Sequence, residues 1–296
     1  MKTLAVLVTA AALTTLAGPA QAASAAPRKP ARIVLATALP VTSACVVVGV
    51  GTTGVATGSR VTVIDDGRVI GRSRVTAGKA IVPISSKVQG SRVTVVVAGQ
   101  RRIITVRTDA AALAASPWLV VNKKVSAGSS TPPRLTTSGN LRLQPSAAGA
   151  YEKMAKTAAR QGTSLWVASS YRSAARQKSL YTAYVARDGR EAADTYSARP
   201  GHSEHQTGLA VDVAGSSCTL SGCFADTAAG RFVKSDAYKY GFVVRYPKGA
   251  DATTGYRYEP WHLRYVGPWL AGYLHSVGSL TLERAFALPA APDYAN

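Results

Sequence analysis

Two short segments in the second half of the chain hold the residues best suited to chemistry. The first contains His205 and Asp212, and the second, about fifty residues later, contains Glu259 and His262. Two imidazoles and one carboxylate can hold a divalent cation and leave a position open for water. A further carboxylate outside the metal shell can then accept a proton from that water. These residue types and their spacing indicate a zinc hydrolase.

The spacing within the first segment predicts a turn followed by a strand. Six residues separate His205 from Asp212, so the two cannot share a helical face in the manner of a His-Glu-x-x-His motif. Gly208 lies between them and supplies the backbone freedom that a chain reversal needs. The alternation over residues 209–213 then points Asp212 away from a buried apolar face.

Pro260 favours a strand for the second segment, because it lacks an amide donor and disfavours the α conformation at Glu259. Period-two alternation places His262 on the same face as Arg264. Glu259 is then expected at the entrance of the strand, close to a metal held by His262. The other face is expected to belong to the core, and it consists of Trp261, Leu263 and Tyr265.

The same residues also have a structural interpretation. Each histidine could be a hydrogen-bonded core residue, and Glu259 could be an ordinary surface acid. The chain has only four histidines, however, and two of them fall in segments that also hold acids, which favours the metal site. Arg172 lies between a predicted strand and a predicted helix, where its guanidinium could neutralise an oxyanion, hold a substrate carboxylate or merely cap nearby carbonyl groups.

Composition predicts an exported protein with anionic partners. Residues 1–22 begin with Lys2, run apolar and end in Ala-Gln-Ala, which is the pattern of a signal peptide. No later stretch approaches the roughly 20 consecutive apolar residues of a membrane span, so we expect a secreted or cell-wall-associated protein with no transmembrane segment in the mature chain. The formal net charge of +20 becomes +19 once Lys2 is removed with the leader.

The basic residues are scattered and form no run of five or more, so we expect no nucleic-acid binding. Anionic cell-wall polymers and peptidoglycan carboxylates are the expected partners. The alternative is that the surplus of arginine only keeps a secreted protein in solution.

The elements that must position the site divide the chain into two domains. Residues 31–108 are predicted to form a small all-β, Ig-like domain, because Val-, Ile- and Thr-rich runs alternate with turn signals such as Asp-Gly at residues 66–67. Residues 109–116 are predicted to be a linker. Residues 117–276 are predicted to form an α+β catalytic domain with a small antiparallel sheet and flanking helices. Residues 277–296 are expected to be a tail with little order beyond a short helix.

Capping residues predict three helices in the α+β domain, beginning at Ser146, Ser173 and Asp226 and each ended by a glycine. The strands predicted in this domain are residues 165–168, 209–213, 242–245 and 262–266.

The three cysteines allow one disulfide. Cys218 and Cys223 are close enough to bridge the loop between them in an oxidising compartment. Cys45 remains, and its apolar neighbours predict a buried, inert thiol.

These motifs resemble those of the VanY-type D-alanyl-D-alanine carboxypeptidases. Residues 203–212 meet the family pattern Ser-x-His-x-x-Gly-x-Ala-x-Asp, and residues 259–262 meet Glu-x-x-His. Further matching stretches extend the resemblance from about residue 118 to about residue 283. The N-terminal β domain lies outside it.

The resemblance implies a zinc metallopeptidase in which Zn²⁺ is held by His205, Asp212 and His262, with Glu259 as the catalytic base. Such an enzyme would remove the terminal D-alanine from peptidoglycan stem peptides that end in D-Ala-D-Ala, with Glu259 activating a zinc-bound water.

Three further positions follow from the resemblance. Arg172 would polarise the scissile carbonyl, and Ser203 and Gln177 would contact the substrate. Ser170 stands where many relatives have Gly, a departure that could narrow the loop but removes no chemical group. Two other functions stay open: an endopeptidase that cuts a cross-bridge with the same metal and base, and a wall-binding protein with a vestigial metal site.

Overall fold

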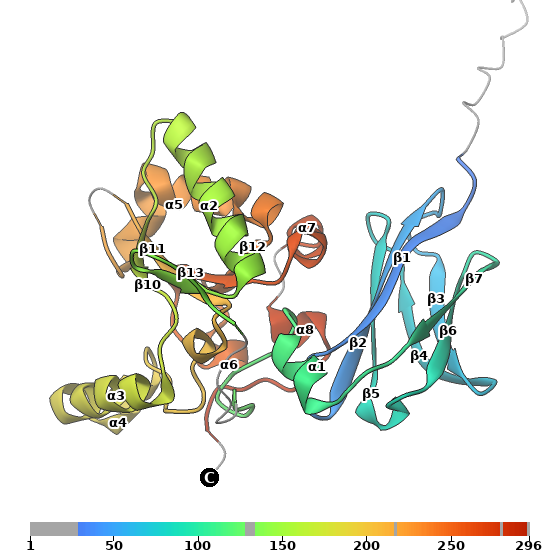
Figure 1. Cartoon of the computed structure of the whole chain (residues 1–296), viewed down its shortest axis with the longest axis horizontal. Coiled ribbons are helices and arrows are strands. Elements are labelled where there is room, and N and C mark those ends of the chain that lie inside the picture. Colours follow the sequence, from blue (N-terminus) through green and yellow to red (C-terminus); the bar gives the residue numbers. More distant parts are fainter. Residues whose placement is uncertain (1–28, 128–133, 216–217, 279–280, 295–296) are drawn as a thin grey trace, which may run out of the picture.

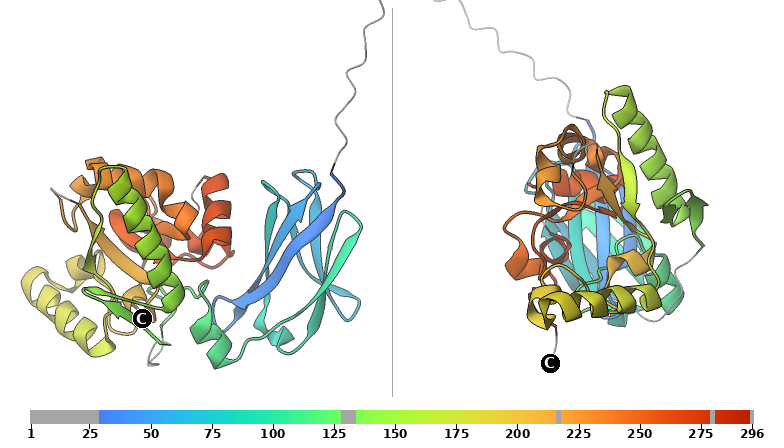
Figure 2. Two further views of the ribbon diagram at one scale, coloured as in Figure 1. Left: turned by 45° about the horizontal axis from the view of Figure 1, so that its top comes forward. Right: turned by 90° about the vertical axis from the view of Figure 1, so that its left-hand side faces the viewer.

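The structure is a computed structural model that describes residues 29–127, 134–215, 218–278 and 281–294. It consists of an all-β half and an α+β half that lie side by side (Figures 1 and 2). The expected signal peptide lies outside the described residues. Among the helices described, none is both long enough and apolar enough to cross a membrane.

The N-terminal half contains two antiparallel sheets that pack on each other. The first has the order β1-β2-β5, formed by β1 (Arg32–Pro40), β2 (Cys45–Thr53) and β5 (Lys79–Ser85). The second has the order β4-β3-β6-β7, formed by β3 (Arg60–Asp65), β4 (Arg68–Arg74), β6 (Arg92–Val97) and β7 (Gln100–Thr105). Valines from both sheets form one buried core, so the predicted all-β domain is confirmed.

One strand of this half, β4, lacks the Val-, Ile- and Thr-rich composition on which the sequence prediction rests. β4 has few apolar residues, and only its pairing with β3 across the turn at residues 66–67 makes it a strand.

A buried apolar cluster joins the two halves. The segment predicted as a linker contains the short helix α1 (Ala110–Ala115), capped by the Asp109 carboxylate. Trp118 follows, is buried, and donates from its indole nitrogen to the carbonyl of Val266. The cluster draws on Val47 and Ile81 of the β half and on the C-terminal helices of the α+β half, which lie next to the β-sandwich in Figure 2.

The α+β half is built on a four-stranded antiparallel sheet with the order β10-β11-β13-β12. The four strands predicted from the sequence are confirmed with bounds that differ by at most three residues, as β10 (Trp166–Ser169), β11 (Ala210–Ala214), β12 (Phe242–Tyr246) and β13 (Glu259–Tyr265). A short hairpin precedes them, formed by β8 (Thr136–Ser138) and β9 (Leu141–Leu143).

One face of this sheet packs against α2 (Pro145–Arg160) and α5 (Ala228–Asp236). The predicted caps of both helices were wrong by one or two residues. Ser146 lies in the first turn of α2, where Pro145 begins the helix. Thr227, not Asp226, caps α5, because its hydroxyl accepts the Gly230 amide.

The other elements of this half surround the site. α3 (Ala174–Asp188) begins after Ser173, whose hydroxyl caps it as predicted, and α4 (Arg190–Asp194) follows directly. These two helices lie beside each other at one end of this half (Figure 1). The remaining helices are α6 (Asp251–Thr254), α7 (Pro268–Ser276) and α8 (Leu282–Ala285).

The C-terminal segment is more ordered than the sequence indicated. Glu283 of α8 and Phe286 are fully buried, and the hydroxyl of Tyr294 accepts the backbone amide of Arg199. Residues 281–294 therefore pack as part of the α+β half.

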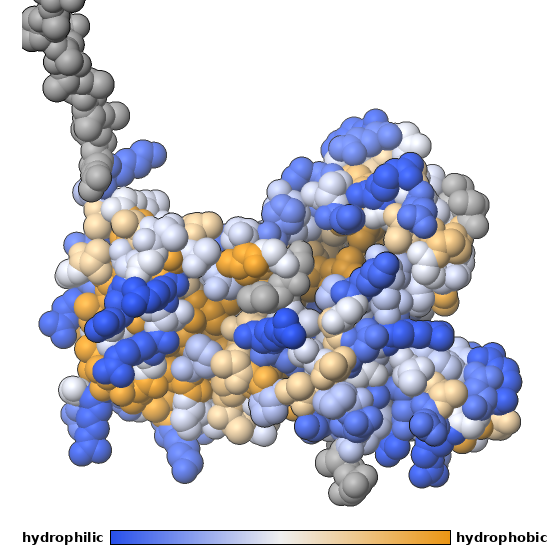
Figure 3. Space-filling model, turned by 180° about the vertical axis from the view of Figure 1, so that it is seen from behind, coloured by the Kyte–Doolittle hydropathy of each residue, from blue (hydrophilic) through white to orange (hydrophobic). Residues whose placement is uncertain are grey.

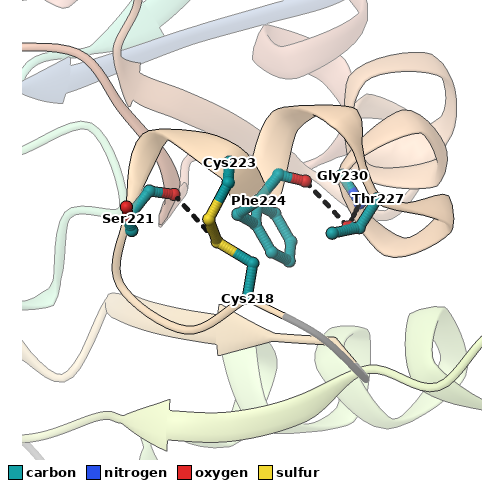
Figure 4. Close-up of a disulfide and its surroundings, with 6 residues drawn as sticks. All are labelled: Cys218, Ser221, Cys223, Phe224, Thr227 and Gly230. Carbon is teal, nitrogen blue, oxygen red and sulfur yellow. Dashed lines mark hydrogen bonds between the residues drawn. A yellow bond between two sulfur atoms is a disulfide. The ribbon is translucent and has the colours of Figure 1, made fainter.

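The expected disulfide joins Cys218 and Cys223 beside Phe224 (Figure 4). Cys45 carries a free thiol but is half-buried, not fully buried as predicted, because it begins strand β2. Burial still raises the pKa of this thiol.

Candidate active site

The strands and one turn bring the three candidate metal ligands together. Asp212 on β11 stands directly opposite His262 on β13 in the antiparallel register. Gly208 adopts a left-handed conformation with φ of 68°, and the turn it makes carries His205 to the same place. One ligand atom from each of the three side chains lies within 4.8 Å of the others, and all three residues are buried.

The donors in this cluster fit a divalent metal. His205 Nε2 lies 3.2 Å from Asp212 Oδ2, and His262 Nδ1 lies 3.2 Å from Asp212 Oδ1. Asp212 Oδ1 is nevertheless a buried oxygen without a hydrogen-bond partner. A buried carboxylate oxygen is costly to leave unpaired, and a cation between these three side chains would satisfy it.

In each histidine, the ring nitrogen that faces away from Asp212 also has a hydrogen-bond partner. His205 Nδ1 lies 2.7 Å from the carbonyl oxygen of Ser170, which can only accept, so this nitrogen carries the proton. His262 Nε2 lies 3.4 Å from Glu204 Oε2. Metal-ligating histidines usually donate their second N–H to a carbonyl or carboxylate, which fixes the ring and leaves the other nitrogen for the metal.

Glu204 is a residue of the site that the sequence analysis did not single out. Its side chain is fully buried, and its Oε1 atom accepts from Arg245 Nε at 2.8 Å and from Arg264 Nη1 at 2.6 Å. Arg245 continues the network through two hydrogen bonds to Glu283. Two glutamates and two arginines therefore balance each other's charge behind His262.

Glu259 lies beside the cluster at the start of β13, as its position before Pro260 predicted. Its Oε2 atom is 3.7 Å from His262 Nδ1. Burial is the main cause that raises the pKa of Glu259 to about 7, and the negative charge of Asp212 adds to it, although His262, Arg257 and Arg172 act in the other direction. A carboxyl group with such a pKa is matched to accepting and returning a proton near neutral pH.

Arg172 faces the same cleft and is fixed from behind. Its Nη1 atom donates to Gln177 Oε1 at 2.7 Å, and its Nη2 atom donates to Ser169 Oγ at 2.9 Å. Burial lowers the pKa of Arg172, whereas the negative charges of Asp212 and Glu259 raise it. The guanidinium is thus held by two polar side chains at the lining of the cleft that contains the cluster.

The two predicted substrate contacts occupy different places. Ser203 is buried and lines the cleft. Gln177 is fully buried, accepts from Arg172 and donates to the Ala198 carbonyl at 2.6 Å. The structure thus places Gln177 behind Arg172.

A cleft of about 240 Å³ is lined by the three candidate ligands together with Glu204, Glu259, Arg172 and Ser203. The three candidate ligands, Glu259 and Arg172 form its inner end. Helix α3 contributes Leu180, Tyr184 and Arg187 to one wall. The cleft therefore offers a buried polar centre and a wall with aromatic and cationic side chains.

The loop before Arg172 accommodates the Ser170 side chain through two hydrogen bonds. Its hydroxyl donates to the Asn140 carbonyl at 2.8 Å and accepts the Arg142 amide at 3.0 Å. The side chain thus ties the His205-binding loop to the β8–β9 hairpin.

Residues 140–268 match the family model of VanY, D-alanyl-D-alanine carboxypeptidase. The putative carboxypeptidase YodJ of Bacillus subtilis (strain 168) is 44% identical over 146 residues, which are 49% of this chain and 53% of that protein. This chain thus spans about half the length of that relative.

The solved structures similar to this chain include two peptidases of different specificity. The LdcB LD-carboxypeptidase has a TM-score of 0.54 and 38% identity, covering 58% of this chain and 86% of that one. The vancomycin resistance D,D-pentapeptidase VanY, in complex with Zn(II), has a TM-score of 0.51 and 29% identity, covering 56% of this chain and 97% of that one.

Fold, site and comparisons together define a class of protein, an α+β carboxypeptidase domain with a His-Asp-His centre. The chain belongs to the VanY family of D-alanyl-D-alanine carboxypeptidases.

Proposed function

We propose that this protein is a zinc-dependent D-alanyl-D-alanine carboxypeptidase that removes the terminal D-alanine from peptidoglycan stem peptides. The observation that carries the proposal is the buried set of His205, Asp212 and His262 with its unpaired carboxylate oxygen. These residues would hold Zn²⁺, which when bound lowers the pKa of water and polarises a carbonyl group.

The side chains of the cleft would carry the proton transfers. Glu259 takes a proton from the attacking water and gives it to the amine nitrogen of the departing D-alanine as the peptide C–N bond breaks. Arg172, fixed by Gln177 and Ser169, donates a hydrogen bond to the carbonyl oxygen on which negative charge develops. Ser203 is in reach of the peptide from the cleft wall.

A product assay tests this proposal. Purified protein is incubated with a synthetic pentapeptide stem, with and without a chelator. We expect free D-alanine and a tetrapeptide, both suppressed by the chelator and restored by zinc. Release of internal fragments from cross-linked peptides would instead support an endopeptidase, and binding without any product would support a wall-binding protein.

An L,D-carboxypeptidase is the second candidate function, because the LdcB LD-carboxypeptidase shares 38% identity with this chain. Such an enzyme would release the C-terminal D-alanine from a tetrapeptide. The bond it cleaves joins the carbonyl group of an L-configured residue to that D-alanine. Comparing kcat/KM for the pentapeptide and the tetrapeptide decides between the two, and a higher value for the tetrapeptide would contradict our first choice.

We also propose that residues 31–108 act as an accessory domain that binds anionic cell-wall polymers, while residues 117–276 carry the catalysis. Residues 29–108 contain 12 Lys and Arg residues against two Asp. Arg60 and Arg74 stand directly opposite each other on β3 and β4. Like charges in such a pair repel, and a bound polyanion would relieve the repulsion.

In Figure 3, hydrophilic side chains project at several places from the β half, between hydrophobic areas of the same face. We expect the protein to sediment with cell walls and to be released by salt, because surface charge interactions are screened. A variant with Arg60, Arg72 and Arg74 changed to Gln should bind walls about tenfold more weakly. Equal retention of the variant and the wild type on cell walls would contradict a role for these three arginines in wall binding.

Binding to cell-wall polymers requires that the protein is exported to the wall. We propose that residues 1–22 direct its export, on the strength of the apolar run and the Ala-Gln-Ala site. The intact mass of protein recovered from the wall or the medium should lack these residues. A mass that includes them would contradict this step.

A further inference from the structure

Arg257 lies at the exposed side of the cleft and has no part in the chemistry above. It precedes Glu259 by two residues, lines the cleft and is exposed to solvent, whereas Glu259 and His262 are buried. Among the residues that the structure describes, no carboxylate lies within salt-bridge distance of its guanidinium. By contrast, Arg245 and Arg264 both contact Glu204.

Its neighbours hold Arg257 in place. The backbone amide donates to the Thr195 carbonyl at 3.1 Å, at the end of helix α4. The guanidinium carbon lies 4.6 Å from the centre of the Tyr196 ring. Tyr196 in turn meets Tyr184 of α3 edge to face, with ring centres 5.2 Å apart. A guanidinium stacked on an aromatic face keeps its N–H groups free at the edge for another partner.

The nearest acid on this wall is already engaged. Asp188 accepts two hydrogen bonds from Arg187, at 2.8 and 2.7 Å, and a further one from the Tyr196 hydroxyl. Arg187 contacts both tyrosines of the aromatic pair, with its guanidinium carbon 5.1 Å from the centre of the Tyr184 ring and its Nη2 atom 3.4 Å from the Tyr196 hydroxyl. The hydrogen bonds from Arg187 and Tyr196 lower the pKa of Asp188, and the charge of Arg257 also lowers it. Among the described residues, however, Asp188 forms its ion pair with Arg187 and none forms one with Arg257.

We propose that Arg257, stacked on Tyr196, is a carboxylate-binding subsite for a substrate residue upstream of the scissile bond. The inference rests on the proposed function. Arg172 and Arg257 line the same cleft and Arg257 is exposed, so a peptide whose scissile carbonyl contacts Arg172 would bring its preceding residues past Arg257. A guanidinium binds a carboxylate through two parallel hydrogen bonds, which an amide cannot reproduce. The preferred substrates are therefore stem peptides with a free upstream carboxylate, not amidated ones.

Two peptides that differ in one group test the subsite. Both end in D-Ala-D-Ala, and an upstream side chain carries a free carboxylate in one and its amide in the other. We expect wild-type kcat/KM to favour the free carboxylate by about fivefold, mainly through KM, as for a partly exposed charged pair. In Arg257→Gln the ratio of the two kcat/KM values should fall to about one. Arg257→Lys keeps the positive charge but not the paired N–H donors of the guanidinium, so its ratio should be intermediate.

Two controls separate the subsite from other effects. Arg190→Gln removes an exposed arginine at the start of α4 and should keep the wild-type ratio. The charge of Arg257 also lowers the pKa of Glu259, but a change in the base alters both peptides alike and leaves their ratio intact.

The ratio of dissociation constants is measured as well, by titrating both peptides into Glu259→Gln protein loaded with zinc. Equal affinities and equal kcat/KM values for the two peptides, or an unchanged preference in Arg257→Gln, would overturn the subsite. Absence of D-alanine release from either peptide would count against the proposed function, while the binding ratio would still decide the subsite.

Discussion

At the scale of single residues, Glu204 determines how His262 can act. It is adjacent in the chain to His205 but contacts the ring nitrogen of His262 that faces away from Asp212. Burial alone would raise the pKa of Glu204, but the charges of Arg264 and Arg245 hold it well below its usual range. Glu204 therefore stays ionised and accepts the His262 N–H, which leaves Nδ1 for the metal.

Glu204→Gln should weaken zinc binding by about 10- to 100-fold, the usual effect of losing a carboxylate behind a metal-ligating histidine. The zinc dissociation constant, measured by competition with a chromogenic chelator, tests this prediction. An unchanged constant in a variant with a wild-type circular dichroism spectrum would show that Glu204 only balances the buried arginines.

At the scale of elements, Glu283 of helix α8 connects the C-terminal segment to the sheet through an ion pair with Arg245. This carboxylate accepts two hydrogen bonds from Arg245 on β12 and one from Asn122. Burial raises the pKa of Glu283, but Arg245 and the hydrogen bonds lower it below the value of a free glutamate overall. The contact therefore stabilises the fold while Glu283 is ionised.

A depressed carboxyl pKa contributes stability above the unfolded-state pKa, which is about 4.3 for glutamate, and loses it as the pH falls toward the folded-state value. Glu283→Gln should thus lower the free energy of unfolding by about 3 kcal/mol at pH 7. The difference from wild type should shrink below about pH 4. Denaturant unfolding at several pH values measures it, and a difference independent of pH would contradict the ionic role of Glu283.

The sequence could predict the sheet that carries the ligands but not the network behind it. Alternation and Pro260 placed His262 and Arg264 on one face, and Gly208 marked the turn, because these are local effects. The partners of Glu204 lie 41 and 60 residues further along the chain. The only sequence signal for this network was the presence of Glu204 in the first segment and of Arg264 in the second. The resemblance implied that Gln177 contacts the substrate, and the sequence alone could not predict its burial and its hydrogen bond to Arg172, because both depend on tertiary packing.

At the scale of the whole molecule, the β-sandwich is packed against the α+β half. Lys79 donates to the Trp269 carbonyl at 3.1 Å, and Trp118 stacks on Trp269 with ring centres 5.7 Å apart. Gly49 of β2 leaves room for these rings, since a Cβ atom there would lie 2.6 Å from Trp118. A rigid junction would hold the cleft at a fixed distance from any wall polymer bound by the sandwich.

Gly49→Ala should destabilise the protein by about 1 to 3 kcal/mol, because the added methyl group overpacks the junction. Gly149→Ala is the matched control, since its Cβ meets no atom within 4 Å and replaces glycine inside helix α2. This control should stabilise by about 0.5 to 1 kcal/mol. Thermal unfolding compares them, and equal melting temperatures would contradict the tight junction.

The central claim, that His205, Asp212 and His262 hold a zinc ion and Glu259 transfers the proton, is tested most directly by zinc content and D-alanine release in two variants. Glu259→Gln should keep stoichiometric zinc and lose activity by at least about a thousandfold, since it cannot accept a proton. His262→Ala should lose both zinc and activity. Full activity in Glu259→Gln, or stoichiometric zinc in His262→Ala, would contradict the account.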